Sequence, residues 1–164
     1  MNFLIKEQTI EKAKKEKINF SNFLEKSIDY FYDIAELKGV TIIPDIDEDI
    51  YINFVPAKLQ KIVDNNLSNG TKYSKEDGNL EVTLKKDSRN NKIILIFKDD
   101  GIGIKDPDKI FSRYYREDEI KGGFGIGLNI VNRIVNEEGV DVYVKSKINE
   151  GSEFKYIFPV NTET

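Results

Sequence analysis

The stretch KIILIFKDDGIGI, residues 92–104, joins an apolar run to two aspartates and two glycines. The run from Ile93 to Phe97 has the β-branched and aromatic composition of a strand. The two glycines allow a sharp turn and the close approach of another group to the backbone. A carboxylate at Asp99, held at the end of a strand, can accept a hydrogen bond from an exocyclic amine such as that of adenine. Taken alone, the stretch is also compatible with a simple loop.

Helical and strand patterns extend on both sides of this stretch. The strands at 80–84 and 93–97 are separated by a polar turn, which indicates a hairpin. Pro44 is expected to end the first strand of the chain, and that strand is expected to pair with the next one. We expect helices from Ser21 or Asn22 to Gly39, from Pro56 to the turn at 75–79 and from Leu128 to Gly139, and strands at 40–43, 50–55, 80–84, 93–97, 140–144 and 154–158.

Length and composition indicate one globular domain with at most a short appended helix. The chain has 164 residues, of which 39% are hydrophobic and 33% charged, with ten Phe and eight Tyr. Such a composition supports a packed core. The net charge of −4 and the scattered Lys and Arg argue against a nucleic-acid partner.

The absence of two residue types, Cys and His, excludes two kinds of chemistry. The chain has no Cys, which excludes disulfides and thiolate nucleophiles and is compatible with a reducing cytoplasm. It has no His, so a histidine base or phosphoacceptor must come from elsewhere. The first seventeen residues match neither a signal peptide nor a membrane span, so we expect no direct membrane contact. Residues 6–17, rich in Lys and Glu, are typical of a solvated helix or linker.

Asn65 and Asn69 lie four residues apart on the helix expected after Pro56, so they share a face at the edge of its apolar stripe. Amide oxygens are suitable ligands for nucleotide-bound Mg²⁺. Lys72 and Tyr73 follow, and offer a charge for phosphate and a flat ring. From this helix alone, the simpler interpretation, in which the amides cap turns or face water, is favoured.

Residues 99–125 form a Gly-rich, aromatic and charged stretch with little periodicity, which is typical of a functional or mobile loop such as a lid. Its last part, GGFGIGL at 122–128, opens a helix whose free N–H groups and dipole favour phosphate. The glycine spacing fits neither the dinucleotide fingerprint nor the Walker phosphate loop.

Taken in order, NNLSNGTKYS, DDGIGI, IFSRYYRED, GGFGIGL and EGSEF resemble the N, G1, F, G2 and G3 boxes of the histidine kinase ATPase family, in the GHKL superfamily. The resemblance covers roughly residues 40–160. It implies a two-layer α/β sandwich of the Bergerat type, in which helices cover a mixed sheet beside a mobile ATP lid. It also implies a division into a linker or dimerisation-helix remnant at 1–18 and a catalytic domain at 19–164.

The resemblance implies ATP and Mg²⁺ as cofactors and assigns roles to individual residues. Asn69 is the implied Mg²⁺ ligand, and Asp99 the implied reader of the adenine amine. The implied catalytic residues are Asn65, Asn69 and Lys72. The implied nucleotide contacts are Asn65, Asn69, Lys72, Tyr73, Asp99, Gly101, Gly103, Ile104, Arg113, Tyr115, Arg116, Gly123, Phe124, Gly125, Ile126, Gly127 and Leu128.

This sequence departs from the family pattern at several positions. Asn66 stands where an apolar residue is usual, and needs a polar partner if it faces inward. Gly70 stands where Ala is usual, which costs about 0.5–1 kcal/mol of helix stability. Phe124 replaces a small hydroxyl residue, and Ser112 replaces an acidic one. Asn65 occupies the position of a water-activating Glu in gyrases and heat-shock chaperones, which predicts slow ATP hydrolysis.

The implied function is that of the catalytic domain of a two-component sensor histidine kinase, which passes the γ-phosphoryl group of ATP to a histidine on a dimerisation domain absent from this chain. A response regulator is the implied downstream partner. The implied location is cytoplasmic, within a parent kinase often anchored in the inner membrane. Two alternatives stay open: a non-catalytic nucleotide- or partner-binding regulatory module, and an anti-sigma serine kinase.

Overall fold

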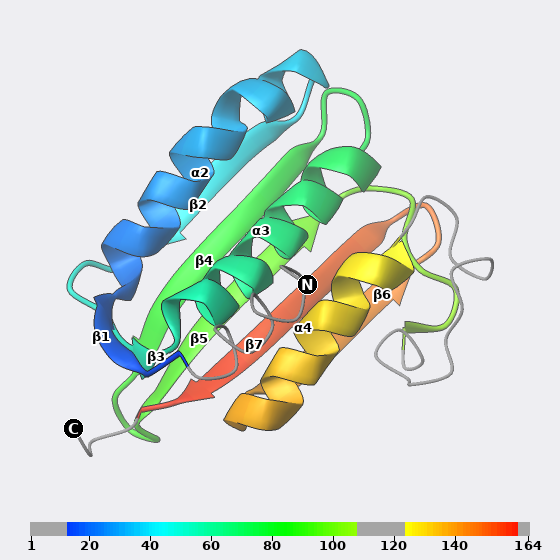
Figure 1. Cartoon of the computed structure of the whole chain (residues 1–164). Helices are drawn as coiled ribbons and strands as arrows, with labels where there is room; N and C mark the ends of the chain where they lie inside the picture. The colour runs from blue at the N-terminus through cyan, green and yellow to red at the C-terminus, as the bar shows by residue number, and fades with distance from the viewer. Residues whose placement is uncertain (1–12, 108–123, 161–164) are drawn as a thin grey trace, which may run out of the picture.

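The computed structural model describes residues 13–107 and 124–160, and of residues 124–127 only the backbone. A five-stranded mixed sheet forms one layer, and three helices cover one of its faces (Figure 1). The helices are α2 (Phe20–Leu37), α3 (Pro56–Tyr73) and α4 (Phe124–Glu138). The strands, in sheet order, are β2 (Thr41–Ile46), β4 (Asn79–Asp87), β5 (Lys92–Asp99), β7 (Gly151–Pro159) and β6 (Asp141–Lys147). This arrangement confirms the predicted α/β sandwich.

The sheet is mixed because β2 runs parallel to β4 while the other neighbours are antiparallel. The hairpin of β4 and β5 is as predicted, with Leu84 opposite Leu95. A second sheet has only two strands, β1 (Glu16–Asn19) and β3 (Tyr51–Phe54), which are antiparallel.

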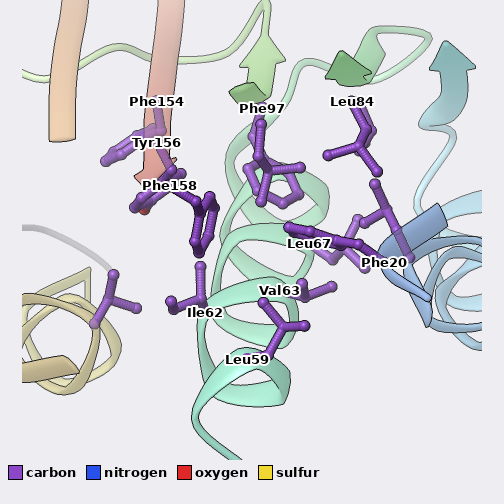
Figure 2. Packing of buried hydrophobic residues seen from close by; sticks show 14 of the residues in the cluster. Phe20, Leu59, Ile62, Val63, Leu67, Leu84, Phe97, Phe154, Tyr156 and Phe158 are labelled. Atoms are coloured by element: carbon purple, nitrogen blue, oxygen red, sulfur yellow. The ribbon is translucent and has the colours of Figure 1, made fainter. Parts of the chain in front are cut away.

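One face of each strand is apolar and meets the helices. Figure 2 shows the side chains of α3 directed at those of the central strands. Alternate residues of a strand point to the same face, so Phe154, Tyr156 and Phe158 of β7 all enter the core, where they are almost completely buried. The rings of Phe20 and Phe158 meet edge to face with centroids 5.4 Å apart, which joins α2 to the sheet. Each such buried side chain contributes about 1.5–3 kcal/mol. The α3 members of this core are Leu59, Ile62, Val63 and Leu67.

The start of α2 differs from the prediction. The N-cap is Asn19, whose Oδ1 accepts a hydrogen bond from the Asn22 backbone N–H at 3.1 Å, and not Ser21 or Asn22. Ser21 is buried and instead links the helix to the loop after β2. Its hydroxyl donates to the Asp47 carbonyl at 2.6 Å and accepts from the Ile50 N–H at 3.0 Å.

The predicted pairing of the first two strands is wrong. The expected strand at 40–43 becomes β2, which continues through Pro44 to Ile46 and pairs with β4. The expected strand at 50–55 becomes β3, which pairs with β1. Pro44 is tolerated because β2 is the edge of the described sheet, where one side of the strand needs no ladder hydrogen bonds.

The structure describes only the last part of the Lys- and Glu-rich start of the chain, and this part leads into a strand. Glu16 and Lys17 belong to β1, which contradicts a helix over these two residues, while residues 1–12 lie outside the described part. Just before β1, the Lys15 Nζ lies 3.3 Å from Glu138 Oε1 at the end of α4. The boundary between linker and domain at residue 18 stays a prediction. Among the described helices, none is both long and apolar enough to cross a membrane.

Candidate nucleotide-binding site

The end of α3 and the turn after β5 meet through a backbone hydrogen bond, in which the Ile102 N–H donates to the Tyr73 carbonyl at 3.2 Å. In Figure 1 the Phe124 end of α4 lies toward the same end of the sheet. The structure therefore brings together two of the predicted motifs, those at 65–74 and 99–104, and the described part of the motif at 122–128 lies toward the same end of the sheet.

Gly101 and Gly103 are required by the contacts of their own backbone. A Cβ on Gly101 would lie 1.9 Å from the Tyr73 carbonyl oxygen. A Cβ on Gly103, whose φ is +75°, would lie 2.0 Å from the Lys147 carbonyl oxygen. The glycines thus let the turn lie directly against the end of α3 on one side and β6 on the other. This is a packing reason for both glycines, in addition to the ligand approach expected from the sequence.

Asp99, the predicted adenine reader, lies at the end of β5 with its carboxyl group partly buried. Burial raises the pKa of this carboxyl group, and the neighbouring Asp100 charge adds to the rise. Backbone N–H groups of Gly101, at 2.9 Å from Oδ1, and of Ser152 oppose the rise by donating to the carboxylate. A carboxylate has about four lone-pair positions, so two donors leave room for an amine of a ligand.

Asp100 has a different role from its neighbour. Its Oδ2 accepts a hydrogen bond from the Asn79 backbone N–H at 3.0 Å, at the start of β4. A Cβ on Gly78 would lie 2.3 Å from Asp100 Oδ1. The carboxyl group of Asp100 therefore holds the loop between α3 and β4, whereas that of Asp99 lies on the turn expected to meet the base.

Asn65 and Asn69 are both half-buried on α3, as expected for side chains at the edge of its apolar stripe. The Asn65 Nδ2 donates to the Lys61 carbonyl of the preceding turn at 2.7 Å. The Asn69 Nδ2 is buried and has no hydrogen-bond partner in the part of the chain that the structure describes. A buried amide without a partner is costly, and a phosphate oxygen of a bound nucleotide would satisfy it. Asn69 therefore fits a phosphate-bearing ligand, and its amide oxygen is the atom that would bind Mg²⁺.

Two other α3 side chains extend the same region. Lys72 is exposed, and its Nζ lies 5.4 Å from the centre of the Tyr73 ring. A contact between Lys72 and a phosphate group stays a prediction. Within the described residues, no group of three or more Asp or Glu side chains is placed to hold a metal ion. The predicted metal ligand Asn69 is among the described residues, and its role as a ligand stays a prediction.

The departures at Asn66 and Gly70 are both explained by packing. Asn66 faces inward and is buried, and its Nδ2 lies 2.7 Å from the Tyr156 hydroxyl on β7. A Cβ on Gly70 would lie 2.5 Å from Leu80 Cδ1. The polar partner that Asn66 needed is therefore present, and Gly70 makes room for Leu80.

The remaining predicted contacts belong to the lid and the helix after it. Arg113, Tyr115, Arg116 and Gly123 lie outside the described residues. Phe124, Gly125, Ile126 and Gly127 form the first turn of α4, so the helix begins four residues before the predicted start at Leu128. Leu128 and Ile104 are buried members of the core, so they support the site from within. Their contact with a nucleotide, like that of the lid residues, stays a prediction.

A cavity of about 360 Å³ borders Asp99 but is a poor candidate for the base. It is lined mainly by charged residues such as Lys98, Lys145 and Glu153. Strand alternation places these side chains on the sheet face that the helices leave uncovered. The motif residues lie on the helix side, next to Tyr73.

Sequence reasoning missed Ser152 as a partner of Asp99. Ser152 is buried and lies opposite Asp99 in the pairing of β7 with β5. The motif EGSEF contained this information. Ser152 is separated from Phe154, Tyr156 and Phe158 by even numbers of residues, so in a strand its side chain lies on the same, core-facing side.

The helix-covered mixed sheet, with paired amides beside an aspartate–glycine turn, defines a GHKL-type ATPase domain. The chain belongs to the family of histidine kinase-, DNA gyrase B- and HSP90-like ATPases, whose model matches residues 54–162. The sensor histidine kinase WalK of Bacillus subtilis (strain 168) is 31% identical over 156 residues, which are 91% of this chain and 25% of the relative. The sensor protein kinase WalK of Staphylococcus aureus is 33% identical over 91% of this chain and 37% of the relative.

Solved structures show the same fold. The catalytic domain of histidine kinase ThkA, nucleotide-free, matches with a TM-score of 0.77 at 18% identity, over 90% of this chain and 96% of that one. Full-length ShkA in complex with AMPPNP matches with a TM-score of 0.76 at 22% identity, over 90% of this chain and 31% of that one. The chain spans only about a quarter of the Bacillus relative and 37% of the Staphylococcus one. The described part of the chain has the fold of the ATPase domains of histidine kinases.

Proposed function

We propose that this chain binds Mg-ATP and transfers the γ-phosphoryl group to a histidine on a separate dimerisation domain. The hydrogen bond from the Ile102 N–H to the Tyr73 carbonyl, at 3.2 Å, is the observation that most supports it. It places the turn that carries Asp99 against the end of the helix that carries Asn69. A base held by Asp99 would thus direct its phosphates toward the Asn69 side of α3.

Asp99 binds the adenine amine in this proposal, and Lys72 and Asn65 bind phosphate oxygens. Asn69 holds the Mg²⁺, which supplies charge neutralisation for the phosphates when bound. Phosphoryl transfer needs little covalent chemistry from the protein, so positioning and electrostatics account for most of the catalysis. An imidazole nitrogen of the acceptor histidine forms the new P–N bond as the bond to the ADP oxygen breaks, and ADP leaves with the electron pair.

The acceptor histidine must lie outside the sequence, because the chain has no His. A dimerisation domain is the proposed partner for this step, and a response regulator is the proposed final acceptor. Slow hydrolysis of ATP by the isolated chain follows from Asn65, since an amide is a poor acceptor for the proton of an attacking water.

The first test is calorimetric titration of the chain with a non-hydrolysable ATP analogue, with and without Mg²⁺. We expect saturable, Mg²⁺-dependent binding that Asp99→Asn weakens at least about tenfold, as for loss of a charge-assisted hydrogen bond. Asp106→Asn is the matched control, because Asp106 is an exposed aspartate on the same segment. Absence of binding by the folded wild-type chain would contradict the proposal.

The second test adds a histidine-bearing dimerisation domain and radiolabelled ATP. A P–N phosphate is labile in acid and stable in alkali, whereas a phosphoserine shows the reverse. Acid-labile label on the added domain would support histidine transfer, and alkali-labile label would favour the serine-kinase alternative. Nucleotide binding with no transfer to either residue type would favour a non-catalytic regulatory module.

A further inference from the structure

Besides the bond from the Gly101 N–H to Asp99 Oδ1, three hydrogen bonds hold the Gly101–Ile104 turn, and one of these three depends on a side chain. The Ile102 N–H donates to the Tyr73 carbonyl at 3.2 Å, and the Asn149 N–H donates to the Ile102 carbonyl at 2.8 Å. Both are backbone contacts that any residue type could make. The third is the bond from the Ile104 N–H to Ser146 Oγ at 2.7 Å, which exists only because residue 146 has a hydroxyl group.

The Ser146 hydroxyl is itself fixed in place. Its Oγ lies 3.0 Å from the Gly151 carbonyl oxygen and 2.8 Å from the Ser152 hydroxyl oxygen. A serine hydroxyl has one proton and two lone pairs, so it can accept from Ile104 while it donates to one of these oxygens. The acceptor presented to the turn is therefore held by β7 and not free to rotate.

The same contacts lead across the sheet to Asp99. Ser146 on β6 is opposite Ser152 on β7, and Ser152 is opposite Asp99 on β5, so the three residues form one row across three strands. The Ser152 backbone N–H is close enough to the Asp99 carboxylate to favour its charged form. Gly151, with φ of +110°, lets the chain pass close to Asp99, because a Cβ there would lie 2.1 Å from the Asp99 carbonyl oxygen.

This row connects the two parts of the proposed base-binding site, the Asp99 carboxylate and the turn that ends at Ile104. We propose that Ser146 is a positioning residue that sets the place of this turn relative to Asp99 and thereby the preference for adenine over guanine. The inference rests on the proposed nucleotide site and deepens it. Ser146 touches no nucleotide itself and acts through the Ile104 N–H and the Ser152 hydroxyl.

The test compares Ser146→Ala with Ser146→Thr, which keeps the hydroxyl and suits a strand. Ser27→Ala is the matched control for loss of a buried serine hydroxyl, because Ser27 bonds to Phe23 on α2 and to Gln60 on α3 and neither bond involves the turn. Each folded chain is titrated with non-hydrolysable analogues of ATP and GTP, and hydrogen exchange is measured at the Ile104 amide.

We expect Ser146→Ala to weaken the ATP analogue about tenfold, as for one lost hydrogen bond, and to lower the ratio of ATP to GTP affinity. The Ile104 amide should exchange faster in this variant, while Ser146→Thr and Ser27→Ala keep wild-type values. If the wild-type chain binds the ATP analogue and Ser146→Ala keeps the wild-type ratio of ATP to GTP affinity, the proposed role of Ser146 is wrong, while the proposed function stands. If the wild-type chain bound neither analogue, the proposed function would fail and the inference with it.

Discussion

Asn66 on α3 and Tyr156 on β7 make a buried hydrogen bond, with 2.7 Å between the Asn66 Nδ2 and the Tyr156 hydroxyl oxygen. Burial raises the pKa of the Tyr156 hydroxyl far above its ordinary value, so the phenol stays neutral and keeps its proton. Asn66 Nδ2 also donates to the Ile62 carbonyl at 2.8 Å. The pair fixes the inward face of the helix that carries Asn65 and Asn69 at the edge of its apolar stripe.

Asn66→Leu and Tyr156→Phe should each lower the free energy of unfolding by about 1–3 kcal/mol, because each leaves a buried polar group without its partner. The double variant should lose less than the sum of the two, since it buries no unmatched polar group. Urea unfolding of the four chains gives the coupling free energy. Strict additivity would contradict a direct interaction.

Gly70→Ala tests two opposing effects. Helix propensity alone favours Ala by about 0.5–1 kcal/mol. The added Cβ would lie 2.5 Å from Leu80 Cδ1, and both positions are buried in the core. Overpacking costs about 1–3 kcal/mol, so we expect net destabilisation in urea unfolding. Leu80→Val in the same chain should recover part of the loss, whereas a stabilised single variant would show that Leu80 moves aside freely.

Asp99→Asn should change stability in a pH-dependent way. Because burial raises the pKa of Asp99, the folded chain holds this proton more tightly than the unfolded chain. Its contribution to stability is therefore present at low pH and is lost as pH rises from the unfolded pKa through the folded one. The variant lacks this ionisation. Its unfolding free energy relative to wild type should increase as the pH rises above about 4, the ordinary pKa of an aspartate, as measured by urea unfolding at several pH values.

The same variant, Asp99→Asn, should be more stable than wild type at neutral pH and should bind nucleotide less tightly. Both effects have one cause, because the carboxylate that is costly to bury is the one that we expect to hold the adenine amine. A pH-independent difference between the two chains would contradict the raised pKa. The exposed control Asp106→Asn should show neither effect.

Gly103 and Gly139 form a matched pair of glycines with positive φ, +75° and +69°. A Cβ on Gly139 meets nothing within 4 Å, whereas one on Gly103 would lie 2.0 Å from the Lys147 carbonyl oxygen. Gly139→Ala should cost about 1–2 kcal/mol for the left-handed backbone alone. Gly103→Ala should cost about 3 kcal/mol or more, since the backbone must also move. Thermal unfolding of both variants measures the difference, and equal costs would show that the turn at Gly103 yields easily.

Much of the fold was predictable because its signals are local. The period of the apolar residues predicted α3 and α4, and the polar turn between two apolar runs predicted the hairpin of β4 and β5. The pairing of β2 was not predictable in this way. Its partner β4 comes after α3, and Pro44 suggested an end where the edge position in fact tolerates it. The strand β1 was missed because its four residues, EKIN, show no alternation of apolar and polar side chains that would indicate a strand.

The candidate site also has parts that local motifs could predict and parts that they could not. Asp99, Asn69 and the glycines were predicted because short motifs carry them. The row of Ser146, Ser152 and Asp99 depends on the strand order β5-β7-β6, which no local pattern records. Likewise Asn66 and Tyr156 are 90 residues apart, so the sequence showed the need for a partner but not its identity.

Pro44 has a further consequence for how this domain behaves in a crowded solution. An edge strand presents free N–H and C=O groups on which strands of other molecules can assemble. β2 pairs with β4 in unbroken register across Pro44, so the missing donor is on the outer side of the strand. A foreign strand added there would lack a hydrogen bond in its middle. One residue thus makes this border of the sheet a poor template for amyloid-like growth.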